Sequence, residues 1–397
     1  MKIGLFSHHP DWATGFGVTA GKIALSLSKL GHEVVCVGFA FGIVSSKEGE
    51  ENSRPYRIWN GSLEKMEAYG VGEFLEQEKP DIIFLNFDIA AVIYFLSLLK
   101  FNQYNKKIYA HSVLDGFPVS PSFLAFVREL DAMIVPTRAS LKYLKREGLT
   151  NIHYAPHGVN TKEFFPLDKH AIRSRQGFDT QFRNKFIIGA FAKNDERKQL
   201  PKIFMAVQHL VFELKQKDVL LYVHAEVKPN LGTGWDLEFL ADWLKIKKHV
   251  IFTEKSFLPQ IGVGLAPSGD ADRRKPLSYL ERINMCDVIV NVPFSGGFEL
   301  CNVEAQACGV PVITTDDGGN IKEVVNDSAI LLKPKMKSVW TNGAIVHLID
   351  EVDLAHALLR VKCDPLLRQN LREKGLENIK RYSWRLLEKK IDTLVNN

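Results

Sequence analysis

The sequence predicts an α/β fold built from two Rossmann-like halves, on three observations. Short apolar runs alternate with helical stretches along the whole chain, which is typical of parallel strands buried on both faces. This alternation stops once, in the charged and turn-rich stretch 159–185, and then resumes. The length of 397 residues is sufficient for two ordinary domains.

The apolar runs predict the strands in order. In the first half they are "KIGLFS", "EVVCVGF", "DIIFLNF", "KKIYAHS", "AMIVPT" and "NIHYAPHG". In the second half they are "FIIGAFA", "VLLYVHAEV", "HVIFTE", "DVIVNVP", "PVITTDD" and "AILLKP". We therefore expect one domain over 1–165 and another over 166–380. The amphipathic tail predicts a long helix with a bend near Tyr382, ending in a segment over about 381–397.

Composition and charge argue against a membrane-spanning, disulfide-rich, zinc-binding or nucleic-acid-binding protein. The apolar window 81–99 contains Asp81, Asn86 and Asp88, which favours a buried strand and its following helix over a membrane span. The five cysteines lie far apart, without the spacing of a disulfide framework or a zinc site. A net charge of +5 suits anionic ligands, and no basic run with interleaved aromatics indicates nucleic acid. We expect a cytoplasmic protein, with membrane association left open.

Two loops of the first half carry candidate site residues. Gly15 and Gly17 precede a predicted helix, where backbone N–H groups can bind an anion; a plain tight turn is the alternative. His111 and Asp115 follow the strand "KKIYA". A neutral histidine can transfer a proton, and an aspartate can accept one or bind a sugar hydroxyl; a loop held by its own hydrogen bonds is the alternative.

The second half opens with a cationic loop, "KNDERKQ", after its first strand. Lys193, Arg197 and Lys198 lie where the carboxyl end of a parallel strand faces a ligand. Several cations in such a loop suit a diphosphate, although a solvated loop has a similar composition.

The stretch "FSGGFELCNVEAQACGVPV" combines a glycine loop, a helix and a strand. Ser295, Gly296 and Gly297 follow an apolar run, and without Cβ atoms the two glycines allow a ligand close to the backbone. The helix predicted from near Leu300 directs its first amides at that ligand. Glu304 on this helix can accept two hydrogen bonds from a ribose diol.

These residues resemble the donor-site signature of family 4 glycosyltransferases, retaining enzymes of the GT-B fold. The resemblance extends to "GFGVTAGKIALSLSKLGHEV", "IHYAPHGVNTKEFFP", "KNDERKQ" and "RYSWRLLEKKI", and so spans nearly the whole chain. The residues that match the signature are Phe298, Glu304, Ala305, Ala307, Gly309, Pro311 and Val312.

The resemblance implies the roles of the residues. A nucleotide-diphosphate sugar would bind mainly to the second domain and the acceptor to the first, with the C-terminal helix crossing back to the first domain. Glu304 would bind the ribose, and Lys193 and Lys198 the diphosphate. The donor-binding set is Gly15, Gly17, Lys193, Arg197, Lys198, Ser295, Gly296, Gly297, Phe298, Leu300 and Glu304, and the catalytic set is His111, Asp115 and Glu299.

Two departures mark an archaeal- or viral-like variant of the signature. Gly296 stands where the family has its first glutamate, and Glu299 stands where it has a glycine. We expect Glu299 to place its carboxylate in the space of the missing one, beside the sugar. On this interpretation, Glu299→Gln lowers turnover and leaves nucleoside-diphosphate affinity nearly unchanged; a capping role for Glu299 is the alternative.

No metal and no cofactor are expected, in line with the family. His8, His9 and Asp11 lie close in sequence, and a polar loop is favoured over a metal site there. Asp316 and Asp317 are interpreted as loop residues near the donor.

The sequence leaves the partner and two other functions open. The acceptor is a saccharide, a lipid or a protein, peripheral membrane contact is undecided, and no oligomeric state is indicated. A protein that binds a nucleotide sugar without turnover is the first alternative, motivated by Gly296. A nucleotide-sugar epimerase is the second.

Overall fold

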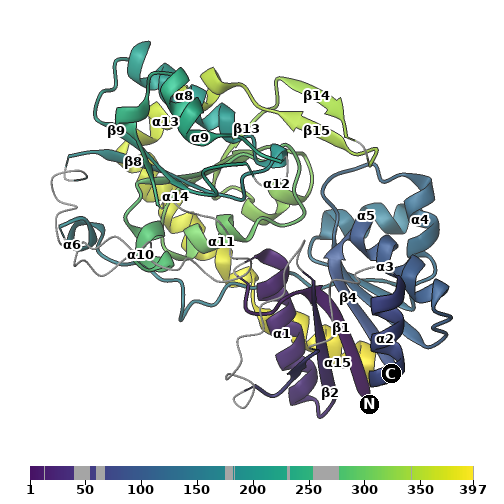
Figure 1. Cartoon of the computed structure of the whole chain (residues 1–397). Helices are drawn as coiled ribbons and strands as arrows, with labels where there is room; N and C mark the ends of the chain where they lie inside the picture. The colour runs from purple at the N-terminus through teal and green to yellow at the C-terminus, as the bar shows by residue number, and fades with distance from the viewer. Residues whose placement is uncertain are drawn as a thin grey trace.

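The protein consists of two α/β domains joined side by side (Figure 1). The computed structural model describes residues 1–12, 14–39, 54–59, 68–174, 182, 184–229, 233–253, 277–340 and 342–396. Each domain is built around one parallel sheet with helices on both faces, as the sequence predicted.

The first domain contains a seven-stranded sheet in the order β3-β2-β1-β4-β5-β6-β7, with all neighbouring strands parallel. Its strands are β1 (Lys2–His8), β2 (Glu33–Phe39), β3 (Arg57–Ile58), β4 (Ile82–Asp88), β5 (Lys107–Val113), β6 (Ala132–Val135) and β7 (Ile152–Tyr154). Its helices are α1 (Gly15–Lys29), α2 (Ala68–Glu78), α3 (Ile89–Phe101), α4 (Pro121–Val127) and α5 (Arg138–Arg146).

The apolar runs form strands because the sheet is buried on both faces. Along β4, Ile83 and Leu85 lie in one core cluster, whereas Ile82 and Phe84 lie in the other. Successive side chains of a strand point to opposite faces, so a strand between two helical layers is mostly apolar, and the one buried polar residue inside β4, Asn86, is hydrogen-bonded to Ser7 and Phe16. The window 81–99 accordingly forms β4 and α3, and no described helix is long and apolar enough to cross a bilayer.

The second domain contains a six-stranded parallel sheet in the order β10-β9-β8-β11-β12-β13. Its strands are β8 (Phe186–Phe191), β9 (Val219–His224), β10 (Val250–Phe252), β11 (Val288–Asn291), β12 (Val312–Thr315) and β13 (Ile330–Leu332). Its helices are α6 (Lys169–Arg173), α8 (Leu200–Phe212), α9 (Leu237–Trp243), α10 (Tyr279–Asn284), α11 (Leu300–Ala307), α12 (Asn320–Val325), α13 (Glu351–Cys363) and α14 (Pro365–Asn378).

An antiparallel hairpin that the sequence did not predict extends from the second domain toward the first (Figure 1). It consists of β14 (Met336–Val339) and β15 (Ile345–Leu348). The amide of Ile345 donates to the carbonyl of Phe117 in the first domain at 2.9 Å, and that of His347 donates to the carbonyl of Phe294 at 2.7 Å. The hairpin is thus fixed to both domains.

The C-terminal helix α15 (Trp384–Val395) crosses back to the first domain, as predicted, and lies beside α1 (Figure 1). Leu387 and Ile391 are buried in the first domain's core. The tail bends through a short 3-10 helix, Ile379–Arg381, just before Tyr382. Gly158 permits the crossing, because a Cβ there would overlap with the backbone nitrogen of Trp384.

Candidate functional site

The loops after β5 and β11 line a cleft between the two domains, and ligands of such folds bind at the carboxyl ends of the strands. Asp115 follows β5 in the first domain, and Ser295 follows β11 in the second. The Ser295 hydroxyl donates to the carbonyl of Asp115. A Cβ on Gly297 would overlap with Val113, so this glycine allows the loop after β11 to lie directly on the end of β5.

A charge cluster occupies the second-domain side of the cleft. The carboxylate of Glu299 lies 2.6 Å from Nη1 of Arg197 and 2.5 Å from Nζ of Lys198. Asn291, the last residue of β11, donates its side-chain amide to the same carboxylate at 3.0 Å. The Glu299 side chain is only 4% exposed. Burial alone would raise its pKa, but attraction to Lys198 and Arg197 outweighs burial and holds the pKa below its usual range.

The backbone explains how Glu299 enters this cluster. Glu299 has a φ of 64°, in the left-handed region that favours glycine, and it immediately precedes α11. Its side chain makes no hydrogen bond to the helix end. A Cβ built on Gly296 would lie 2.7 Å from Oε1 of Glu299. The Glu299 carboxylate therefore fills the space into which a side chain at position 296 would point.

Glu304 lies on α11 beside a group of aromatic rings. The Tyr279 hydroxyl donates to Oε2 of Glu304 at 3.1 Å. The Tyr279 ring centroid lies 5.8 Å from that of Phe191 and 5.4 Å from that of His224, which end β8 and β9. Burial raises the pKa of Glu304 to about 7, although the hydrogen bond from Tyr279 opposes the rise. A partly ionised carboxylate is thus held beside rings that can stack on a base.

His111 is the most deeply buried of the first-domain candidates. It lies within β5, which continues to Val113, and is 0% exposed. Its Nδ1 lies 2.9 Å from the side-chain oxygen of Asn86, and its Nε2 is buried without a hydrogen-bond partner in the described part of the chain. Burial lowers the pKa of His111 to about 3, so the imidazole is neutral near pH 7.

Asp115 faces the charge cluster across the cleft. Its carboxylate lies 3.9 Å from Nη1 of Arg197. Burial raises the pKa of Asp115, while the charge of Arg197 opposes this rise. Such a carboxylate can accept a proton or bind a hydroxyl group.

The two glycines at the start of α1 have different surroundings. A Cβ on Gly15 would lie 3.8 Å from Cδ1 of Leu300 in the second domain, so Gly15 faces α11 across the cleft. A Cβ on Gly17 would overlap with the carbonyl of Trp12, and the Gly17 amide already donates to Thr14 at 3.0 Å. Gly17 is therefore required by the tight turn before α1, and its amide is not available to a ligand.

The remaining predicted residues divide between the cleft and the core. Lys193 lies close enough to His8 in the first domain to assist burial in lowering the pKa of His8 to about 4. Phe298 is buried against His157 and Tyr382, with ring centroids 4.8 Å and 5.3 Å away, and so belongs to the domain junction. Leu300 packs against the same group.

Two loops that the sequence marked by their acidic or histidine residues, 8–11 and 316–317, make local contacts. Asp11 accepts from Arg54 at 2.7 Å, and Nδ1 of His9 lies 3.8 Å from it. Asp317 accepts three backbone N–H groups at the start of α12, and Asp316 accepts one from Gly318. Across the described ranges, no three His, Cys, Asp or Glu residues are grouped to hold a metal ion.

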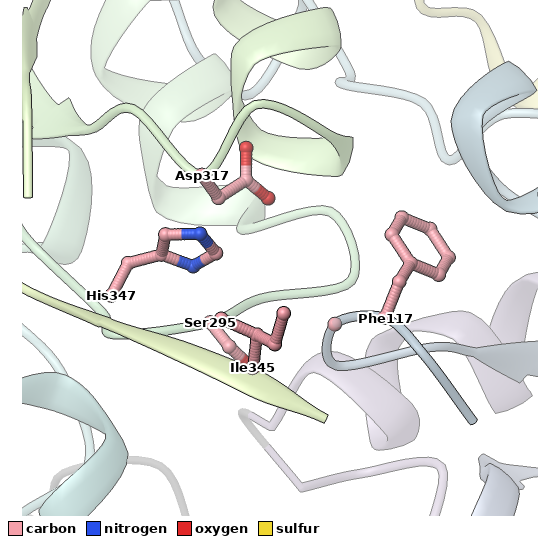
Figure 2. A pocket seen from close by; sticks show the side chains of 6 residues that line it. Phe117, Ser295, Asp317, Ile345 and His347 are labelled. Carbon is pink, nitrogen blue, oxygen red and sulfur yellow. The ribbon is translucent and has the colours of Figure 1, made fainter. Parts of the chain in front are cut away.

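Several residues at the site were not predicted from the sequence. Asn291 ends an otherwise apolar strand and could have been recognised as a polar residue at a strand end. Tyr279 and the hairpin residue His347 lie in stretches without a motif. His347 lines a cavity of about 170 Å³ between the domains, together with Phe117 and Asp317 (Figure 2).

Two family models match the sequence, one in each domain. Residues 13–163 match Glycosyltransferase Family 4, and residues 276–364 match Glycosyl transferases group 1.

Two curated relatives illustrate the sequence similarity. The D-inositol 3-phosphate glycosyltransferase of Stackebrandtia nassauensis is 26% identical over 274 residues, covering 65% of this chain and 52% of the relative. A probable sucrose-phosphate synthase 1 of Oryza sativa is 33% identical over 100 residues, covering 25% of this chain and 8% of the relative. The matches thus span about half of the first relative's length and a small part of the second's.

Solved structures match over the entire chain. HepE of Anabaena in complex with UDP-glucose superposes with a TM-score of 0.70 and 13% identity, covering 100% of this chain and 99% of that one. Sucrose-phosphate synthase from Thermosynechococcus elongatus superposes with a TM-score of 0.68 and 17% identity, covering 100% of this chain and 98% of that one. The chain therefore has the GT-B fold, and each of its two domains matches a family model of glycosyltransferases.

Proposed function

We propose that the protein is a glycosyltransferase that moves a sugar from a nucleotide-diphosphate sugar to an acceptor hydroxyl with retention of configuration. The observation that carries this proposal is the charge cluster of Arg197, Lys198 and Glu299 at the cleft. UDP-glucose is the first donor to test, because HepE, which shares the fold, is solved with it.

In this proposal, three groups of residues bind the diphosphate, the ribose and the base of the donor. Its diphosphate binds Arg197 and Lys198, because paired cations bind phosphate oxygens with charge-assisted hydrogen bonds. The ribose binds Glu304, whose carboxylate accepts from a diol. The base lies against the rings around Tyr279. Stabilising the charge on the departing diphosphate is the largest contribution that such a site makes to the rate.

The reaction exchanges one bond at the anomeric carbon. The bond to the diphosphate oxygen breaks, a bond to the acceptor oxygen forms on the same face of the sugar ring, which retains the configuration, and the acceptor's proton passes to the Asp115 carboxylate. Once the diphosphate pairs with Arg197 and Lys198, Glu299 can turn to the sugar, beside the position of Gly296. Its negative charge then stabilises the positive charge that develops on the sugar ring.

The test combines calorimetry with a rate measurement. Lys198→Ala is expected to cost about 2–4 kcal/mol of transition-state stabilisation, measured as kcat/KM for nucleoside-diphosphate release from UDP-glucose. Lys202→Ala is the matched control, because Lys202 pairs with Glu351 on the neighbouring helix. Equal values of kcat/KM in the two variants would overturn the role of Lys198.

Binding without turnover is the second candidate, favoured by the fact that Glu299 already neutralises both cations. Calorimetric binding of UDP-glucose with no release of nucleoside diphosphate, with or without an acceptor panel, would favour this candidate.

A further inference from the structure

The cavity between the domains is lined by none of the residues that contact the donor under Proposed function, and it shares only Ser295 with the donor-binding set expected from sequence. Its volume of about 170 Å³ far exceeds the roughly 10–15 Å³ that one water molecule requires, so it can admit a ring-sized group. The residues that line it are Gly116, Phe117, Ser295, Asp317, Ile345 and His347.

The hairpin β14–β15 gives this cavity a fixed wall. Ile345 and His347 both lie on β15, and their amides are bonded to the carbonyls of Phe117 and Phe294. The ring of Trp340 in the turn lies 4.2 Å from that of Phe294. Because the hairpin is held to both domains, the cavity exists only where the two domains meet.

The lining combines an apolar ring with unused hydrogen-bonding capacity. Figure 2 shows Phe117 on one side of the cavity, and His347 and Asp317 on the other, with the imidazole directed toward the carboxylate. Nδ1 of His347 is buried and has no hydrogen-bond partner in the described ranges. A buried polar atom without a partner costs about 1–3 kcal/mol, and a ligand hydroxyl that reached Nδ1 would recover part of this cost.

The charge of the lining disfavours a phosphate. Asp317 contributes a carboxylate, and burial lowers the pKa of His347, so the imidazole is neutral near pH 7. The six described lining residues include no lysine or arginine. Three amides at the start of α12, those of Gly319, Ile321 and Lys322, are already bonded to Asp317 and cannot bind an anion.

The cavity adjoins the proposed reaction centre. Gly116 directly follows Asp115, and the carbonyl of Ser295 accepts from Nη1 of Arg197 at 2.9 Å. A ring in the cavity would therefore lie next to both the proposed base and the diphosphate site.

We propose that this cavity is an acceptor subsite that binds an uncharged, hydroxyl-bearing ring, stacked on Phe117 and hydrogen-bonded to His347 and Asp317. The inference rests on the proposed glycosyltransferase function and makes it more specific. The subsite is expected to bind a neutral sugar or cyclitol unit and to exclude a sugar phosphate.

The test measures ring binding by saturation-transfer NMR in the presence of UDP. The neutral ligands are methyl α-D-glucopyranoside, methyl α-D-mannopyranoside and myo-inositol, and the charged one is glucose 6-phosphate. At least one neutral ring is expected to bind to the wild type. Its affinity is expected to fall about tenfold in Phe117→Leu and His347→Ala, because each removes one principal contact. His347→Asn, which keeps a polar atom near Nδ1, is expected to recover part of the loss.

The control is Ser338→Ala, because Ser338 pairs with Val346, points to the other face of the hairpin from His347 and is exposed. This variant should bind the neutral ring like the wild type. Calorimetry with UDP on every variant verifies folding and the donor site. If none of UDP, GDP and ADP binds to the wild type, the proposed function itself fails; if GDP or ADP binds in place of UDP, that nucleotide replaces UDP in the experiment. If UDP binds but no neutral ring does, the subsite is wrong. Equal ring affinity in all variants, or tighter binding of glucose 6-phosphate, would also contradict it.

Discussion

Glu299 has two potential partners, the cations of the diphosphate site and the donor sugar. In the structure its carboxylate contacts Arg197 and Lys198, so a diphosphate must compete with it. This contact revises the expectation from sequence that nucleotide affinity would be unaffected by Glu299→Gln. Removing the charge frees both cations, and we expect affinity for UDP to rise several-fold while turnover falls by about 10²–10³, the size typical of one lost electrostatic contact. Calorimetry and the rate of UDP release measure the two effects.

The exchange variant Gly296→Glu/Glu299→Gly separates position from charge. A glutamate at 296 points into the space that the Glu299 carboxylate now fills, and glycine suits the left-handed backbone at 299. We expect the double variant to recover at least part of the turnover that Glu299→Gly alone loses. If the double variant turned over no faster than Glu299→Gly alone, a carboxylate at position 296 could not replace the one at position 299.

Glu304 gives nucleotide binding a dependence on pH. Its pKa of about 7 means that it is mostly protonated in the free protein at pH 6 and mostly ionised at pH 8. Ribose hydroxyls donate to the ionised form, so binding favours ionisation and UDP affinity should rise with pH through about 7. One pH unit below the pKa, about one-tenth of the Glu304 carboxyl groups are ionised. The affinity for UDP at that pH should therefore be at most roughly tenfold lower than at high pH.

The comparison with Glu304→Gln isolates this effect, since titration of the UDP phosphate affects both proteins alike. Calorimetry between pH 5.5 and 8.5 should give a ratio of wild-type to variant affinity that rises with pH. A constant ratio would assign Glu304 a structural role with Tyr279.

At the scale of elements, helix α5 is capped from the opposite domain. The Glu323 carboxylate of α12 accepts the amides of Arg138 and Ala139 at 2.8 and 2.7 Å. Losing such a cap typically costs about 1 kcal/mol, so Glu323→Ala should lower the melting temperature by roughly 2–4 °C. Glu377→Ala is the control, because Glu377 is exposed. Equal melting temperatures in the two variants, measured by calorimetry, would show that the contact adds no stability.

The strands could be predicted from sequence because both sheets are buried on two faces. The run before Asp88 is apolar except for Asn86, and the run before Asn291 is apolar, for that reason. The hairpin could not be predicted in this way. Every residue of β14 is exposed, so no alternation marks it, and its position depends on contacts with Phe117 and Phe294, far away in sequence.

The candidate site shows the same limit. Lys198 could be selected by residue type and by its place after a strand, and Glu299 by its departure from the family signature, and the structure brings them together. Their pairing joins residues that are 101 positions apart, and it depends on the left-handed backbone at Glu299, which residue type would have argued against. The contact between Tyr279 and Glu304 likewise appears only in three dimensions.

At the scale of the whole molecule, the account requires that one donor contact both the cations of the second domain and the carboxylate of Glu299 in a single cleft. The most direct test is a crystal structure with an intact nucleotide sugar, beginning with UDP-glucose. We predict the diphosphate within hydrogen-bond distance of Arg197 and Lys198, the ribose on Glu304, and the Glu299 carboxylate turned to a sugar hydroxyl. A diphosphate bound elsewhere, or a Glu299 carboxylate still paired with both cations and beyond hydrogen-bond distance of the sugar, would contradict the account.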